Sequence, residues 1–263
     1  MVVRPKKSLG QNFLVDNNII NIITELGNIS NKDIVLEIGP GTGNLTKNIL
    51  DQKPKKLIVI EKDYNLSNIL RKKFSSKIKI INDDILKINE EEIFKDKMIV
   101  FGNLPYNISS QILVKWLKLN NLNFFSKRFI LMFQKEVADR IIAKFNEKNY
   151  GRLSIFTYWK MDIKKVKDIN PKSFYPVPKV ESTILLMEPK EKIFELNNAK
   201  NLEYITNVFF NQKRKMIKKP MNLLFKNSKK IADKLKLDLT SRPQNLSPEN
   251  YFQICEEYEN LYQ

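Results

Sequence analysis

Glycines and acidic residues occur at the ends of three predicted strands, in the order expected of a nucleotide-binding site. Gly39, Gly41 and Gly43 lie in EIGPGTG, between a strand and a helix, and allow a tight turn with close ligand approach. Glu61 ends the second strand in VIEKD, where its carboxylate could accept two hydrogen bonds from ribose hydroxyls. Asp84 ends the third strand in INDDI and could accept from an adenine amino group. A structural turn or a solvated carboxylate would explain each feature alone, but together they favour an adenosine-containing cofactor.

The spacing of these glycines argues against a dinucleotide. It is G-x-G-x-G, and Asn44 stands where the dinucleotide pattern G-x-G-x-x-G would require the third glycine. Glu37, just before the glycines, would repel a pyrophosphate and attract a positively charged centre such as a sulfonium. The pattern E-x-G-x-G-x-G, followed by an acidic end of the second strand, resembles the S-adenosyl-L-methionine site of class I methyltransferases. The resemblance implies that this compound is the cofactor.

A second group of residues that could take part in a reaction is Asn103-Leu104-Pro105-Tyr106, at the end of another predicted strand. The amino group of adenine is a weak nucleophile because its lone pair is delocalised into the ring. The side-chain oxygen of Asn103 and the backbone carbonyl of Leu104 could accept its two hydrogens and aim the lone pair at a methyl group. Pro105 would hold Leu104 extended without offering a competing N–H, and Tyr106 could stack on the base for about 1–3 kcal/mol. Catalysis would then be mainly positioning; a capped strand-to-helix turn is the alternative.

The composition excludes several other chemistries. The 263-residue chain has no histidine and one cysteine, Cys255, which excludes a histidine base, a Ser-His-Asp triad, a cysteine- or histidine-rich metal site and an intrachain disulfide. We therefore expect no metal and a Cys255 side chain packed in a core. No apolar stretch is long enough to span a bilayer, and no signal peptide is evident. A cytoplasmic protein without a membrane partner is expected.

The net charge points to a polyanionic partner. The chain has 46 Lys and Arg against 29 Asp and Glu, a formal charge of +17, which is typical of nucleic-acid-binding proteins. A general bias toward lysine is the alternative explanation. Residues 213–236 contain ten Lys or Arg and one acid. Candidate phosphate contacts in this basic segment are Lys213, Arg214, Lys215, Lys218 and Lys219, unless they form only a solvated helix face.

The predicted elements describe an α/β fold. Short β-branched runs occur at 33–39, 56–63, 77–83, 97–103 and 128–134, with helical patterns at 44–52, 64–74 and 134–145. The continuous apolar character of the runs predicts parallel strands buried on both faces. Two further strands, 152–159 and 181–188, are predicted to close the edge of a doubly wound, mostly parallel, Rossmann-like seven-stranded methyltransferase sheet. Because the pattern becomes helical near Pro189, we expect a catalytic domain over 1–188 and a small all-helical RNA-binding domain over 189–263.

Further motifs extend the resemblance over nearly the whole chain. KSLGQNFL at 7–14, FGNLPYNISS, QKEVADRI, YGRLS and FYPVPKVES are similar to motifs of the small-subunit ribosomal RNA adenine dimethyltransferase (KsgA/RsmA) family. The resemblance implies N6 dimethylation of two adjacent adenines near the 3′ end of 16S ribosomal RNA during small-subunit biogenesis. It also suggests a monomer acting on an immature 30S particle. The target adenine must be unpaired or flipped out, since pairing otherwise engages its amino group.

The resemblance also assigns roles to particular residues. It implies that Asn12, Leu14, Gly39, Glu61, Asp84 and Asn103 contact the cofactor, in addition to Glu37 and Gly41 of the glycine loop. It implies that Asn103, Leu104, Pro105 and Tyr106 form the target-adenine site, with Phe174 of FYPVP stacking on the other face of the base. Without the resemblance, FYPVP is a stiff proline-containing loop. The basic segment resembles the family's Q-x-R-K pattern, here NQKRKMI.

Three other functions are compatible with parts of the sequence. The nearest is a large-subunit (23S) ribosomal RNA adenine dimethyltransferase that confers antibiotic resistance, although LGQNFL and NLPYNIS favour the small-subunit branch. A non-catalytic RNA-binding or transcription factor on the same fold would not need Glu61, Asp84 and NLPY together. A nicotinamide dehydrogenase fits least, given the glycine spacing and the lack of histidine.

Overall fold

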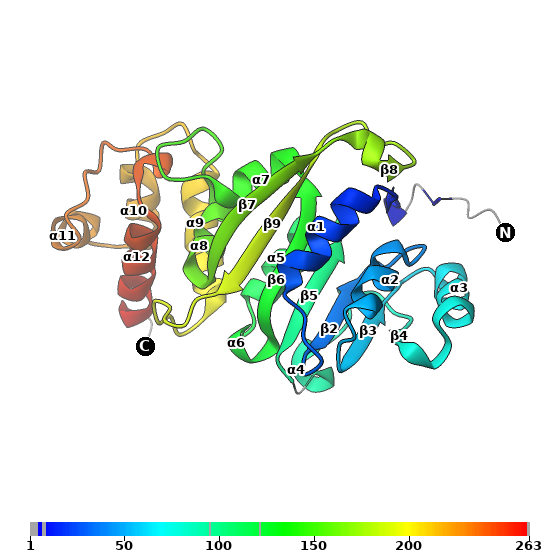
Figure 1. Cartoon of the computed structure of the whole chain (residues 1–263). Helices are drawn as coiled ribbons and strands as arrows, with labels where there is room; N and C mark the ends of the chain where they lie inside the picture. The colour runs from blue at the N-terminus through cyan, green and yellow to red at the C-terminus, as the bar shows by residue number, and fades with distance from the viewer. Residues whose placement is uncertain (1–4, 7–8, 95, 121, 262–263) are drawn as a thin grey trace. The chain divides into compact units, whose positions relative to one another are not determined.

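The computed structural model describes residues 5–6, 9–94, 96–120 and 122–261, which fall into two compact units (Figure 1). Unit 1 comprises the residues up to Ala138 together with Asp162–Lys190, and unit 2 comprises Asp139–Met161 and the residues from Glu191 onward. Lys7 and Ser8 of the motif KSLGQNFL lie outside the described residues.

Unit 1 is built on a mixed sheet whose described strands number seven, in the order β4-β3-β2-β5-β6-β9-β7. The strands are β2 (Ile34–Ile38), β3 (Lys56–Ile60), β4 (Lys79–Ile81), β5 (Met98–Asn103), β6 (Ser126–Gln134), β7 (Met161–Ile169) and β9 (Ser182–Pro189). The pairs β2–β3, β2–β5, β3–β4 and β5–β6 are parallel, and β6–β9 is antiparallel. The fold class is confirmed. Since β2 lies between β3 and β5, the carboxyl ends of β2 and β5 border the crevice where such sheets bind ligands.

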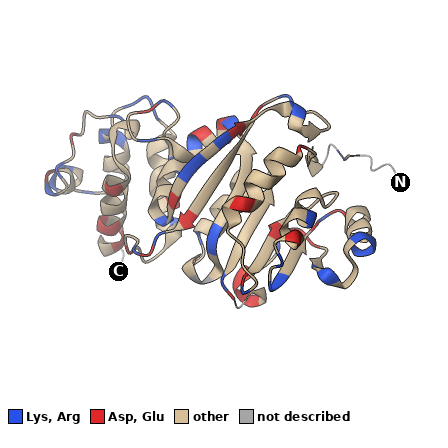
Figure 2. Ribbon diagram, viewed as in Figure 1, with Lys and Arg blue, Asp and Glu red and all other residues tan. Residues whose placement is uncertain are grey.

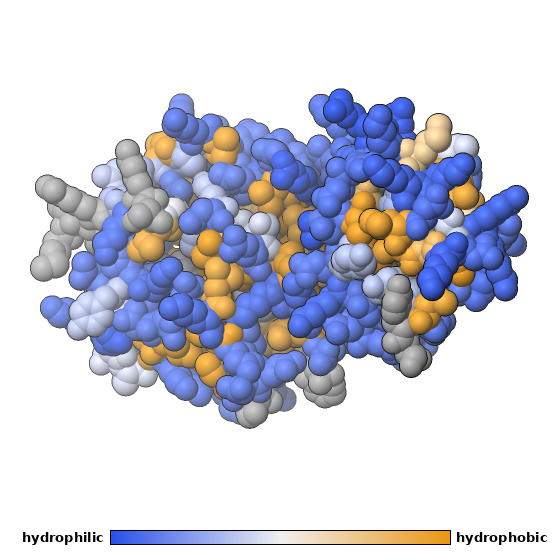
Figure 3. All heavy atoms as spheres, turned by 180° about the vertical axis from the view of Figure 1, so that it is seen from behind, coloured by the Kyte–Doolittle hydropathy of each residue, from blue (hydrophilic) through white to orange (hydrophobic). Residues whose placement is uncertain are grey.

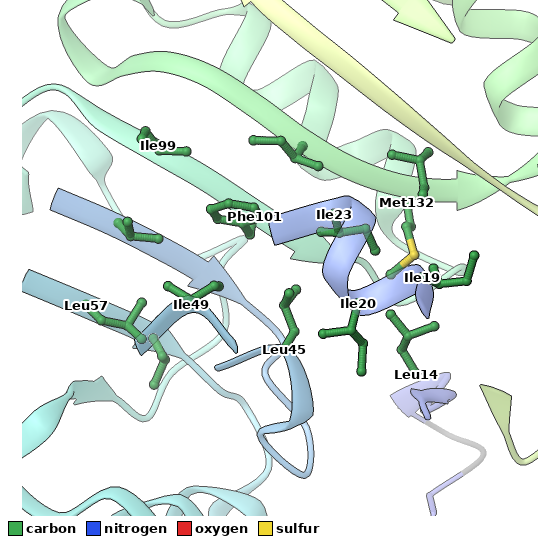
Figure 4. Packing of buried hydrophobic residues seen from close by; sticks show 14 of the residues in the cluster. Leu14, Ile19, Ile20, Ile23, Leu45, Ile49, Leu57, Ile99, Phe101 and Met132 are labelled. Atoms are coloured by element: carbon green, nitrogen blue, oxygen red, sulfur yellow. The ribbon is translucent and has the colours of Figure 1, made fainter. Parts of the chain in front are cut away.

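Helices bury both faces of this sheet. Those of unit 1 are α1 (Asn17–Gly27), α2 (Asn44–Asp51), α3 (Tyr64–Phe74), α4 (Glu90–Ile93), α5 (Ser109–Leu117), α6 (Leu122–Phe125) and, spanning the division, α7 (Lys135–Ile142). On one face, Ile20 of α1 and Ile49 of α2 share a buried cluster with Phe101 of β5 (Figure 4). On the other, Trp116 of α5 packs against Phe129 of β6, with ring centroids 5.2 Å apart. Burial on both faces explains why the strands are apolar throughout.

Shorter elements complete the fold. They are β1 (Phe13–Leu14), which pairs antiparallel with β8 (Phe174–Tyr175), and the 3₁₀ helices η2 (Ser75–Lys77), η3 (Pro171–Ser173) and η4 (Pro243–Asn245). The β1–β8 pair brings the opening segment of the chain beside the FYPVP loop, two regions about 160 residues apart in the sequence.

The predicted strand at 152–159 is wrong. These residues form α8 (Arg152–Lys160), and the strand next to β9 at the sheet edge is β7. Ile155, Phe156 and Trp159 of α8 are all buried. A helix buried on most sides lacks the polar stripe that makes helical periodicity visible, and its β-branched and aromatic residues then imitate a strand.

Unit 2 is helical. It contains α8, α9 (Ala199–Phe210), α10 (Lys218–Leu224), α11 (Ser228–Lys234) and α12 (Pro248–Leu261), and no strand occurs among its described residues from 191 to 261. Because α8 packs against α9 and α12, a segment from the middle of the chain joins this unit. The compact units therefore divide the chain differently from the single boundary expected near residue 188. Cys255 is fully buried in unit 2, as expected.

The surface is rich in charge. Figure 2 shows Lys and Arg along β7 and through the segment that contains α11. On the face drawn in Figure 3, hydrophobic residues form separate patches between hydrophilic ones. None of the helices that could be described is both long and apolar enough to cross a membrane.

Candidate active site

A cavity lies in unit 1 at the carboxyl ends of β2, β3, β4 and β5. Its space is about 1090 Å³ when the mouth and the adjoining solvent are included. The opening segment from Leu9 to Leu14, the glycine loop and the loop 103–108 form most of its wall. The cavity brings together these predicted site residues: Asn12, Leu14, Glu37, Gly39, Gly41, Glu61, Asp84, Asn103, Leu104, Pro105 and Tyr106.

The glycine loop requires glycine for both conformation and space. Gly39 and Gly41 have φ angles of 67° and 58°, in the left-handed region. A Cβ atom on Gly41 would lie 2.7 Å from a ring carbon of Phe13, so the opening segment packs directly on this loop. The loop therefore presents bare backbone to the cavity.

Glu61 and Asp84 lie where the sequence placed them, but each already has partners. Glu61 is buried, and its carboxylate accepts hydrogen bonds from the backbone N–H of Gly41 (3.2 Å) and Asp63 (2.8 Å). Burial raises the pKa of Glu61, although these two hydrogen bonds act to lower it. Asp84 pairs with Lys62 at 2.8 Å. Burial alone would raise the pKa of Asp84, but the bonds from Lys62 and the Leu86 N–H outweigh it and hold the pKa below its ordinary value.

Glu37 is more deeply buried and changes the charge argument made from the sequence. Its carboxyl accepts a hydrogen bond from the Thr46 hydroxyl at 2.7 Å. Burial, reinforced by the nearby Glu61, raises the pKa of Glu37 to about 8. At neutral pH the Glu37 carboxyl is therefore mostly uncharged before a ligand binds. A cation bound nearby would be attracted to the Glu37 carboxylate only if its binding lowered the pKa of Glu37.

This pKa predicts a pH-dependent stability. Between about pH 4.5 and pH 8, folded Glu37 keeps a proton that the unfolded chain has lost, so unfolding releases a proton. The free energy of unfolding of the wild type should therefore fall relative to that of Glu37→Gln as the pH rises through this range. Urea unfolding at several pH values measures the difference. Glu25→Gln, at an exposed position of α1, should stay parallel to the wild type, and a parallel curve for Glu37→Gln would contradict the prediction.

Asn103 is oriented by the opening segment. Its side-chain nitrogen donates to the backbone carbonyl of Asn12 at 2.8 Å, which fixes the amide and leaves its oxygen as the atom free to accept a bond in the cavity. The sequence predicted both residues at the site but gave no sign of this bond, because every residue has a backbone carbonyl and the residue type does not show which one will accept a bond.

Tyr106 is held by a residue that the sequence analysis missed. The Tyr106 hydroxyl lies 2.7 Å from Oγ of Ser182, which is fully buried at the start of β9. Burial raises the pKa of Tyr106 and the bond to Ser182 lowers it. Ser182 ends the motif FYPVPKVES, which is the signal that could have identified it.

Phe174 is the exception among the predicted site residues. It is 1% exposed, belongs to the same buried cluster as Leu14, and is absent from the cavity wall. In this structure its ring presents no free face, so the stacking of Phe174 on a base stays a prediction and would require the ring to move. Neighbouring residues of a strand point to opposite sides, and the exposed ring of this loop is Tyr175, at 56%.

The basic segment lies in unit 2 and is not uniform. Arg214, Lys215, Lys218 and Lys219 are exposed. Lys213 is half-buried and donates to the backbone carbonyls of Lys148 (2.7 Å) and Tyr150 (2.9 Å). The Lys213 ammonium therefore supports the fold of unit 2, unlike the other four.

The sheet order, the glycine loop after β2 and the acidic end of β3 around one cavity define the class of S-adenosyl-L-methionine-dependent methyltransferases. The chain belongs within it to the ribosomal RNA adenine dimethylase family, which it matches over residues 2–260. The predicted family and enzyme class are thereby confirmed. The chain is a ribosomal RNA adenine dimethyltransferase that uses S-adenosyl-L-methionine.

Individual relatives agree with this assignment. The chain is 56% identical over 261 residues to ribosomal RNA small subunit methyltransferase A of Pelagibacter ubique (strain HTCC1062), covering 99% of each chain. It is 39% identical to the protein of the same name from Wolbachia sp. subsp. Drosophila simulans (strain wRi), covering 99% of this chain and 96% of the relative. A dimethyladenosine transferase from Plasmodium falciparum is similar in structure, with a TM-score of 0.79, 28% identity and coverage of 94% and 98%. The 23S ribosomal RNA methyltransferase ErmE, at 23% identity and a TM-score of 0.70 over 94% and 99%, shares the fold.

Proposed function

We propose that the chain dimethylates the N6 amino groups of two adjacent adenines near the 3′ end of small-subunit (16S) ribosomal RNA, during biogenesis of that subunit. The observation that carries this proposal is that the amide of Asn103, held by the Asn12 carbonyl, lines the same cavity as the glycine loop, Glu61 and Asp84. The full-length similarity to proteins named for the small subunit supports the 16S molecule as the substrate over the large-subunit alternative.

The residues of the cavity fit the cofactor. The bare backbone at Gly39 and Gly41 admits close approach, and Glu61 has oxygen lone pairs left for the ribose hydroxyls. Asp84 would accept from the adenine amino group, with Asn12 and Leu14 covering the cofactor from the opening segment. When bound, the cofactor supplies an electrophilic methyl group on a sulfonium, and Glu37 lies deepest among the acids that could face that charge.

The NLPY loop would orient the target. Oδ1 of Asn103 and the carbonyl of Leu104 accept the two N6 hydrogens, which turns the nitrogen lone pair toward the methyl group. Pro105 keeps that carbonyl extended, and Tyr106, held by Ser182, stacks on one face of the base. No strong base is needed, because the amine becomes acidic once methylated and its proton leaves to water. Catalysis by positioning suits a chain without histidine.

The partner and the division of labour are part of the same proposal. Unit 1 would hold the cofactor and the target base, and the helical part would bind RNA through its exposed basic residues. We propose an immature small-subunit particle as the substrate, a monomeric enzyme and a cytoplasmic location.

The direct test is transfer from labelled cofactor to immature small subunits, to large subunits and to naked ribosomal RNA, followed by mapping of the methylated bases. Label on two adjacent adenines of the small-subunit RNA supports the proposal. Label confined to a large-subunit adenine would favour the alternative of a resistance enzyme, and absence of transfer with normal cofactor binding would favour a non-catalytic factor.

The basic segment should govern RNA affinity but not chemistry. Replacing Arg214, Lys215, Lys218 and Lys219 with glutamine should flatten the dependence of log affinity on log salt by about 2–3 units if roughly three of them contact phosphate. Lys213 is left intact because it holds the loop at Lys148 and Tyr150. Cofactor affinity should not change.

The matched control removes the same charge elsewhere. Lys53, Lys55, Lys56 and Lys79 are exposed at or near the amino ends of β3 and β4, away from the cavity. Their replacement with glutamine should alter the slope much less. Equal slopes for the two variants would show that the basic segment only contributes general charge.

A further inference from the structure

Tyr175 occupies a place that the predicted roles leave unexplained. In the β1–β8 pair, Tyr175 lies directly opposite Phe13, and Phe174 lies opposite Leu14. Directly opposite residues of an antiparallel pair project from the same face. Phe13 and Leu14 both line the cavity, so the β1–β8 pair borders it, and Tyr175 lies beside Phe13 just outside the cavity wall.

The ring of Tyr175 is available there. Tyr175 is 56% exposed, whereas Phe13 is 8% exposed and Phe174 is 1% exposed. The same loop exposes Val177 (60%) and Val180 (45%), which makes the loop surface near the tyrosine partly apolar. An aromatic ring left in water next to a binding cavity is suited to stacking on a base.

The surrounding charges fit the same ligand. Lys172 and Lys179 are exposed on either side of Tyr175 in the loop. An aromatic side chain with lysines around it is the arrangement by which proteins hold single-stranded nucleic acid, because the ring stacks on a base while the cations follow the phosphates. Because only the flipped-out target base enters the site of reaction, the neighbouring nucleotide must lie outside the cavity.

We propose that Tyr175 is a stacking platform for the unpaired nucleotide next to the target adenine, with Lys172 and Lys179 placed for its phosphates. This inference rests on the proposed function and adds a second base-binding position to it. Tyr106 stacks on the base undergoing transfer, and Tyr175 binds a neighbouring base that is not reacting in that turnover, which keeps the strand extended while the target is flipped out.

The test uses small-subunit particles reconstituted with a synthetic 3′ RNA fragment. In this fragment 2-aminopurine, or an abasic site, replaces in turn each nucleotide flanking the adenine that is methylated. Stacking on Tyr175 should quench the 2-aminopurine fluorescence at one of the two flanks when the wild-type enzyme binds. Tyr175→Phe and Tyr175→Trp should retain the quenching, and Tyr175→Ala should lose it.

Steady-state kinetics separates stacking from a structural effect. Tyr175→Ala should raise KM for the particle by about 5- to 100-fold while kcat and cofactor affinity stay within about twofold. With the abasic fragment the wild type and Tyr175→Ala should have the same KM. Tyr204→Ala, which removes a tyrosine that is 45% exposed in unit 2, should leave the quenching unchanged.

Two failures are distinguishable. If the wild type does not methylate the particle that carries natural bases, the proposed function itself is wrong. If the wild type methylates it but quenching persists in Tyr175→Ala, only the role of Tyr175 is overturned. The same conclusion follows if the KM of Tyr175→Ala exceeds that of the wild type by the same factor with the natural and with the abasic fragment.

Discussion

Asn103→Ala should lower kcat for methyl transfer by at least about 100-fold and leave affinity for the small-subunit particle within about twofold. In the proposed mechanism the side chain contacts one amino group and no phosphate, so its loss affects orientation of the nucleophile rather than binding of the RNA. A misplacement of about 1 Å at a reacting centre can cost on the order of 100-fold in rate. The measurement is single-turnover transfer at saturating cofactor, since Asn103 also lies in the wall predicted to contact the cofactor.

A second substitution at this position tests the orientation of the amide. Asn103→Asp keeps an oxygen acceptor but replaces the N–H that donates to the carbonyl of Asn12 at 2.8 Å. The carboxylate would then face a carbonyl oxygen that repels it. We expect Asn103→Asp to be about as slow as Asn103→Ala, whereas Asn65→Ala, at an exposed position of α3, should turn over normally. Wild-type turnover by Asn103→Ala would rule out the amino-acceptor mechanism.

The sheet could be predicted from the sequence because its strands are buried on both faces. Runs such as DIVLEIG and KMIVFGN are too short for helices and too apolar for an exposed edge, which leaves few other structures. The carboxyl ends of parallel strands lie at one edge, so Gly39, Glu61 and Asn103 could be placed together before any coordinates. α8 was missed because burial on most sides removes the periodicity on which a helix prediction depends.

The parts of the site that the sequence did not predict are contacts between distant segments. Ser182 meets Tyr106 across 76 positions, and the Asn12 carbonyl meets Asn103 across 91. Residue types and local spacing carry no information about which buried hydroxyl will face which ring. The same limit explains Phe174 and Tyr175: a motif identifies the loop, but only the register of β1 with β8 decides which aromatic ring is buried and which is exposed.

Glu61→Ala should weaken cofactor binding by about 10- to 150-fold, which corresponds to the loss of about 1.5–3 kcal/mol of hydrogen bonding to a charged acceptor. Calorimetric titration with S-adenosyl-L-methionine measures the change. Glu61 also holds the backbone N–H of Gly41 and of Asp63, so part of the loss could come from a loosened glycine loop. A cofactor analogue that lacks one ribose hydroxyl separates the two causes.

If Glu61 binds the ribose, the wild type should bind the deoxy analogue several-fold more weakly than the full cofactor, and Glu61→Ala should bind both equally. If Glu61 acts only by holding the loop, the variant should lose affinity for both compounds by the same factor and still discriminate between them. The pH adds a second check: burial raises the pKa of Glu61, so the carboxylate that accepts both hydroxyls becomes more populated as the pH rises. The preference of the wild type for the full cofactor should therefore grow with pH, whereas Glu61→Ala should show no such growth, and Glu25→Ala on α1 should behave as the wild type does. Unchanged affinity in Glu61→Ala would remove Glu61 from the site and leave Asp84 and the glycine loop as the only support for a bound adenosine.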